Sequence, residues 1–81
     1  MPLDALRDFV SAHRLSEQER AVLAHAIDGC SMKQAAARLG ISNKTVESYW
    51  TRIYNKTNRR SQLEVIAKVV RWVSDSALRQ P

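Results

Sequence analysis

Residues 31–54 read SMKQAAARLGISNKTVESYWTRIY, and this stretch decides the fold. Ser31 followed by Gln34 forms a capping box, which marks the start of a helix. Gly40 marks the end of that helix, because glycine adopts the left-handed conformation of a C-terminal cap without strain. Ser42 is then a good N-cap for a second helix. The stretch predicts a helix, a glycine turn and another helix, which is the pattern of a helix-turn-helix.

The positive charge of the chain lies on the same stretch. The net charge of all 81 residues is +5, whereas residues 33–60 carry seven basic side chains and the single acid Glu47, a local charge of +6. The seven are Lys33, Arg38, Lys44, Arg52, Lys56, Arg59 and Arg60. A basic surface confined to one supersecondary unit is typical of a DNA-binding module.

Composition narrows the class of protein further. A chain of 81 residues makes one domain, and its only prolines are Pro2 and Pro81, so nothing interior blocks helices. The sequence therefore predicts an all-α fold. The lone Cys30 excludes an internal disulfide and fits a reducing cytoplasm. We see no secretory signal and no apolar run near the roughly 20 residues needed to span a bilayer, so a cytoplasmic location is expected and a membrane partner is not.

Helices are also predicted on both sides of residues 31–57. Residues 1–14 read as an amphipathic N-terminal helix, separate from a domain over residues 15–81. The side chains expected on its apolar stripe are Leu3, Leu6, Phe9, Val10 and His13. Ser16 with Glu19, and Ser61 with Glu64, form two more capping boxes. The second opens a last helix over about residues 61–73 or longer, and Gly29 closes the helix that follows Ser16.

The last helix carries two apolar stripes, and a helix with two apolar faces must bury both. The first stripe consists of Val65, Ile66, Val69, Trp72 and Val73. The second, called the outer stripe below, consists of Leu63, Ala67 and Val70. The outer stripe is expected to meet a partner. The alternative is that the N-terminal helix folds back and covers it with Leu6, Phe9 and Val10.

These landmarks together resemble the LuxR/GerE-type DNA-binding domain over about residues 15–70. The residues that carry the resemblance are Leu15 to Leu23, Gly29, Ala35-Ala36, Leu39 to Ser42, Thr45-Val46, Ile53 and Lys56. The resemblance implies four helices, of which the second and third form the helix-turn-helix and the fourth mediates dimerisation. The chain departs from the family's usual Leu at Thr57. The N-terminal helix lies outside the resemblance.

A helical wheel divides residues 43–57 into two faces at about 100° per residue. Val46, Trp50, Ile53 and Thr57 fall on the side expected to pack on the domain, with Tyr49 at its edge. We expect the opposite face to enter the major groove, which is about 12 Å wide and admits a helix. The predicted base-reading residues are Lys44, Glu47, Ser48 and Thr51. The predicted phosphate contacts are Thr45, Arg52, Lys56, Arg59 and Arg60.

The expected function is sequence-specific binding of double-stranded DNA by a transcriptional regulator, as a homodimer on an inverted repeat. Two alternatives keep the fold: a module that binds a regulator or an RNA polymerase subunit, to which Glu47 within a basic helix points, and a promoter binder similar to sigma-factor region 4. No catalytic set is recognisable, and His13 and His25 lack partners at metal-ligand spacing, so we expect no enzyme, metal or cofactor. The sequence contains no small-molecule-binding domain. It fits either a small complete regulator or the output part of a larger one.

Overall fold

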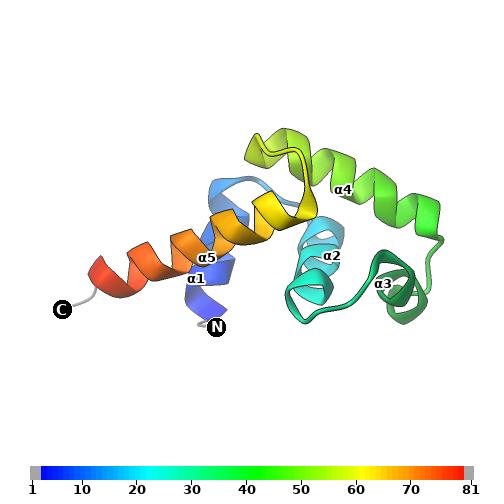
Figure 1. Ribbon diagram of the computed structural model, residues 1–81, viewed down its shortest axis with the longest axis horizontal. Helices are drawn as coiled ribbons and strands as arrows, with labels where there is room; N and C mark the ends of the chain where they lie inside the picture. The colour runs from blue at the N-terminus through cyan, green and yellow to red at the C-terminus, as the bar shows by residue number, and fades with distance from the viewer. Residues whose placement is uncertain (1–2, 80–81) are drawn as a thin grey trace.

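The computed structural model describes the backbone of residues 3–79 and the side chains of residues 5–76. Within this part of the chain the structure is entirely helical, which confirms the all-α prediction. The molecule is elongated, about 43 Å in its longest dimension and 20–22 Å in the others. Its helices are α1 (Leu3–Ala12), α2 (Glu17–Ile27), α3 (Met32–Leu39), α4 (Asn43–Thr57) and α5 (Gln62–Arg79), shown in Figure 1.

Serine caps begin α2, α3 and α4 as the sequence predicts. The Ser16 Oγ accepts the Glu19 N–H at 3.2 Å, and the Glu19 carboxylate accepts the Ser16 N–H at 2.8 Å. Ser31 and Gln34 form the same reciprocal pair at the start of α3. The Ser61 box differs, because the Glu64 carboxylate accepts the N–H of Arg60 at 3.3 Å instead of that of Ser61. The Ser61 Oγ still caps α5 by accepting the Glu64 N–H at 3.2 Å.

Left-handed residues end the two helices of the helix-turn-helix. Gly40 caps α3 at φ 69°, and Asn58 caps α4 at φ 57°. Glycine and asparagine reach this region at low cost, which explains why the chain can turn sharply at both points. The predicted bounds of α4, residues 43–57, are confirmed. The structure places α2, α3 and α4 against one another, with α3 and α4 forming the right-hand part of Figure 1.

The core is built from every helix of the described chain. Its largest fully buried side chains are Trp50, Phe9, Leu23 and Ile53, packed with smaller residues such as Val69. Ala35 and Ala36 of α3 are each only 3% exposed. Small side chains at these positions allow α3 to approach its neighbours closely. Because Trp50 and Ile53 of α4 are among the buried side chains, the apolar face predicted for α4 is the face that packs on the domain.

Helix α1 packs on α5 (Figure 1), and the contact involves the first apolar stripe of α5. The ring of Phe9 meets Trp72 edge-on with centroids 5.7 Å apart, and the Trp72 Nε1 donates to the Asp8 carboxylate at 3.3 Å. Leu63 and Val70 of the outer stripe stay 77% and 51% exposed. The alternative in which α1 covers the outer stripe is therefore wrong for this structure. Pro2, and the side chain of Leu3, lie outside what the structure describes.

Candidate nucleic-acid interface

The two faces of α4 are separated as the wheel predicts. Val46, Trp50, Ile53 and Thr57 are at most 2% exposed. Tyr49 lies half-buried at the edge of the core. The opposite face consists of exposed side chains: Lys44, Glu47, Ser48, Thr51, Arg52 and Asn55. A polar helix face anchored by a buried apolar face has the shape and chemistry of a groove-reading helix.

The four predicted base-reading residues lie together on this exposed face. Two of them, Ser48 and Thr51, donate their hydroxyl protons to the carbonyls of Lys44 and Glu47 one turn earlier, each at 3.1 Å. Their oxygens keep lone pairs that could accept from base edges. The Lys44 ammonium adds a donor and the Glu47 carboxylate adds an acceptor to the same face. The face can therefore both donate to and accept from base edges.

The predicted phosphate contacts run from the first turn of α4 to the segment beyond its C-terminal end. At the N-terminal end the Thr45 hydroxyl lies 2.9 Å from that of Ser42, which caps the helix. Arg52 lies over the ring of Tyr49, with its guanidinium carbon 5.7 Å from the ring centroid. Beyond the C-terminal end, Arg59 donates to the Asn58 carbonyl at 2.9 Å and Arg60 is exposed.

Lys56 has an intramolecular partner that the sequence did not reveal. Its Nζ donates to the Glu19 carboxylate at 2.7 Å and to the Arg14 carbonyl at 3.0 Å. Glu19 is 1% exposed and the Lys56 side chain is 35% exposed, and their ion pair joins the first turn of α2 to the last turn of α4. A phosphate contact by Lys56 stays a prediction, but its ammonium already serves to position α4.

Opposing influences act on the pKa of Glu19. Burial raises the pKa, but hydrogen bonds from Lys56 and Ser16, with the Lys56 charge, outweigh burial and lower it below its ordinary 4.5. A carboxyl whose pKa is lower in the folded state than in the unfolded chain stabilises the fold above the unfolded value. That contribution is lost as the pH falls through the folded pKa.

We therefore expect the free energy of unfolding to decrease as the pH is lowered below about 4.5, and to decrease more steeply for the wild type than for a Glu19→Gln variant. Urea unfolding, followed by circular dichroism at a series of pH values between about 7 and 3, measures both curves. The variant removes only the titrating group, so the exposed carboxylates act as a common background. Parallel curves for the two proteins would show that Glu19 does not contribute to the pH dependence.

The outer stripe forms an apolar surface along α5. Leu63, Ala67 and Val70 are all exposed, whereas Val65 and Val69 of the same helix are fully buried. Leu63 and Val70 are the large hydrophobic side chains found exposed in the described part of the chain. Exposed apolar residues in helical register are typical of a surface that meets a partner.

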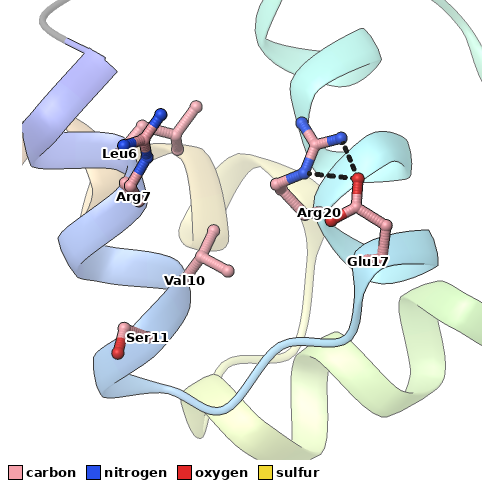
Figure 2. Close-up of a pocket in the computed structure, with 6 residues that line it drawn as sticks. All are labelled: Leu6, Arg7, Val10, Ser11, Glu17 and Arg20. Carbon is pink, nitrogen blue, oxygen red and sulfur yellow. Dashed lines mark hydrogen bonds and ion pairs between the residues drawn. The ribbon is translucent and has the colours of Figure 1, made fainter.

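A separate groove of about 420 Å³ lies between α1 and α2 (Figure 2). It exists because α1 makes its main helix contact with α5 and stands away from α2. Figure 2 shows Arg7 and Arg20 on opposite sides of the groove, with Glu17 bound to Arg20. Its lining residues are Leu6, Arg7, Val10, Ser11, Glu17 and Arg20. None of them is among the predicted DNA contacts.

Other kinds of site receive no support from the described residues. They contain no cluster of three or more His, Cys, Asp or Glu side chains placed to hold a metal ion. Cys30 is a free, half-buried thiol. Among the described helices, none combines the length and apolar character needed to cross a membrane.

Comparison with known proteins agrees with this geometry. Residues 13–69 match the family described as bacterial regulatory proteins, luxR family. The chain is 32% identical over 59 residues to a protein of Streptomyces halstedii named "Probable HTH-type transcriptional regulator GfsR", an alignment that covers 73% of this chain and 23% of that protein. No solved structure gives a significant match. The matched residues include all of α2, α3 and α4 and leave α1 outside. The chain belongs to the luxR family of bacterial regulatory proteins, whose helix-turn-helix domain binds DNA.

Proposed function

We propose that this chain is a sequence-specific transcriptional regulator that places α4 in the major groove of double-stranded DNA. The observation that carries the proposal is the division of α4 into a buried apolar face and an exposed face that gathers Lys44, Glu47, Ser48 and Thr51. The local charge of +6 on residues 33–60 supplies the attraction to phosphates. The name of the Streptomyces halstedii relative, a transcriptional regulator, supports the same role.

Base-reading and phosphate-binding residues are expected to differ in their effects on binding. Ser48→Ala or Glu47→Gln should change the preferred sequence, with about 1–3 kcal/mol lost or gained at the base pair that each residue reads. Arg60→Gln should weaken binding to all sequences about equally, because a phosphate contact carries no sequence information. Selection of preferred sites from a random duplex pool, followed by anisotropy titration of matched and mismatched duplexes, measures both effects.

Arg60 is a cleaner phosphate probe than Lys56, because Lys56 is also bound to Glu19 within the fold. Asn55→Ala serves as a matched control on the exposed face of α4, outside the predicted contact set. If the Ser48, Glu47 and Arg60 variants all weakened every sequence equally, the division into base-reading and phosphate-binding residues would be wrong.

We further propose that the regulator acts as a symmetric dimer through the outer stripe of α5. A two-fold protein binds an inverted repeat, with one subunit on each half-site about one helical turn of DNA apart. The exposure of Leu63 and Val70 in the single chain supports this role, since both would be covered by a second α5.

The Val70→Glu variant tests the dimer directly. Placing a charge in the outer stripe should prevent the second copy from packing, because an unpaired charge is costly to bury. Analytical ultracentrifugation with an inverted-repeat duplex should find two wild-type chains on each duplex and one chain for the variant. Asp75→Lys, an exposed charge change about 110° around the helix from the centre of the outer stripe, is the control and should leave two chains bound. Two bound chains for Val70→Glu, with wild-type affinity, would exclude the outer stripe as the interface.

A further inference from the structure

Helix α5 is bonded to the end of α4 by a lysine. The Lys68 Nζ donates to the backbone carbonyl of Thr57, the last residue of α4, at 2.7 Å. The last carbonyls of a helix have no partner within the helix and carry its negative dipole end, so a cation bound there is favourable. Lys68 therefore binds the end of α4 through both its charge and its hydrogen bond.

The carbonyl that Lys68 contacts belongs to a fixed residue. Thr57 is fully buried, and its hydroxyl donates to the Ile53 carbonyl at 2.7 Å. The backbone N–H of Arg59 donates to the Tyr54 carbonyl at 3.1 Å, which closes the last turn of α4. The bond from Lys68 therefore joins α5 to a residue that is itself held by the fold.

The connection between the two helices is bonded at its other end too. The Glu64 carboxylate of α5 accepts the N–H of Arg60 within the connecting segment. Lys68 is half-buried at this junction, and this burial, with the nearby charge of Arg59, lowers the pKa of its ammonium. The short connection and the Lys68 bond both restrain how α4 lies on α5.

Lys68 and the outer stripe occupy different faces of α5. At about 100° per residue, Lys68 lies about 130° around the helix from the centre of Leu63, Ala67 and Val70. One face of α5 thus holds the end of the recognition helix, and another is free for a second copy. In a dimer built on the outer stripe, the angle between α4 and α5 decides how far apart, and in what orientation, the two recognition helices lie.

We infer that Lys68 is a positioning residue that fixes the angle between α4 and α5 and thereby sets the half-site spacing that the dimer accepts. The spacing part rests on the proposed dimer; the angle does not. One base pair more or fewer between half-sites moves them by about 3.4 Å and rotates them by about 35°. A fixed angle between the helices would reject such a change, and a loose one would tolerate it.

The angle is measured first, in the full chain without DNA. Spin labels at Asn43→Cys and Asp75→Cys, in a Cys30→Ser background, report the distance between the start of α4 and the far half of α5 by pulsed electron resonance. We expect a narrow distance distribution with Lys68, a clearly broader one in Lys68→Met, and a narrow one again in Lys68→Arg, which keeps a charged donor. Arg71→Met, an exposed change one turn along α5, is the control and should leave the distribution narrow.

The spacing is measured next, on the selected inverted repeat with its spacer lengthened or shortened by one base pair. The wild type should prefer one spacer by about tenfold or more, and Lys68→Met should reduce this preference to about threefold or less. A loss of about threefold is the size expected for the net contribution of one hydrogen bond. Binding to an isolated half-site should remain near wild type, which a general loss of folding would not allow.

The outcomes separate the inference from the proposed function. An unchanged distance distribution in Lys68→Met would overturn the positioning role. A broadened distribution with unchanged spacer preference would overturn the link to spacing. If the wild type selected no two-fold sequence, the proposed dimer and the spacing role would fail together, and the distance measurement would still decide whether Lys68 fixes the angle.

Discussion

Replacing Phe9 by Ala is expected to destabilise the domain by about 3–5 kcal/mol, the usual cost of removing a fully buried phenyl ring. Phe9 is 0% exposed, and the centroid of its ring lies 4.1 Å from the ring centroid of His13 and 5.7 Å from that of Trp72. At about 0.05–0.15 kcal/mol per residue, a domain of this size has only about 4–12 kcal/mol in total. Helix α1 lies outside the family match, yet it supplies one of the largest buried side chains of the core.

Urea unfolding of wild type, Phe9→Ala and Leu6→Ala measures this contribution. Leu6 lies on the same helix but is only half-buried, so its truncation should cost clearly less. If both variants showed the same small decrease in the free energy of unfolding, the packing of α1 would contribute little to the stability of the domain. The expected result would instead make α1 a required part of this regulator's fold.

Replacing Lys56 by Met is expected to cost about 2–3 kcal/mol of stability. The change leaves the Glu19 carboxylate, 1% exposed, without its cation, and breaking a buried pair from one side is strongly destabilising. The expected loss lies below that of a fully buried pair because the Lys56 side chain is 35% exposed. Lys44→Met, on the exposed face of the same helix, should change stability by less than about 0.5 kcal/mol.

A double-mutant cycle with Glu19→Gln isolates the ion pair. If Lys56 acts through Glu19, adding Glu19→Gln to Lys56→Met should cost less than Glu19→Gln costs alone, because the unpaired charge is then absent. Strict additivity of the two changes would show that the 2.7 Å contact contributes nothing. Any loss of DNA binding in Lys56 variants must be measured where they remain folded, since this residue also holds α4 in place.

Local features of the chain were readable from the sequence because each depends on neighbours within one helical turn. The capping serines gave the starts of α2, α3 and α4, and the spacing of Val46, Trp50 and Ile53 identified the buried face of α4. Even here one contact differed: the Glu64 carboxylate bonded to Arg60 and not to Ser61. Such details depend on how the preceding turn enters the helix.

Contacts between distant parts of the chain could not be read in this way. Nothing in the local pattern pairs Lys56 with Glu19, 37 positions away. Nor does it show that α1 packs on the face of α5 that carries Trp72 and leaves the outer stripe uncovered. Lys68 lies between the two apolar stripes of α5, and no residue near it in the sequence indicates its partner. The sequence shows only a basic residue flanked by core positions on an amphipathic helix. The structure shows that its partner is the carbonyl of Thr57.

The most direct test of the central claim is binding of the full chain to a labelled random-sequence duplex, followed by fluorescence anisotropy across a series of salt concentrations. If α4 and its basic flanks bind DNA, the protein should bind at low salt, and log K should fall with log salt at a slope of about −0.9 for each phosphate contacted. Four such contacts would give a slope near −3.6, and Arg60→Gln should reduce its magnitude by about 0.9. Absence of binding at about 50 mM salt, where non-specific contacts are strong, would contradict the claim and leave the exposed face of α4 as a surface for a protein partner.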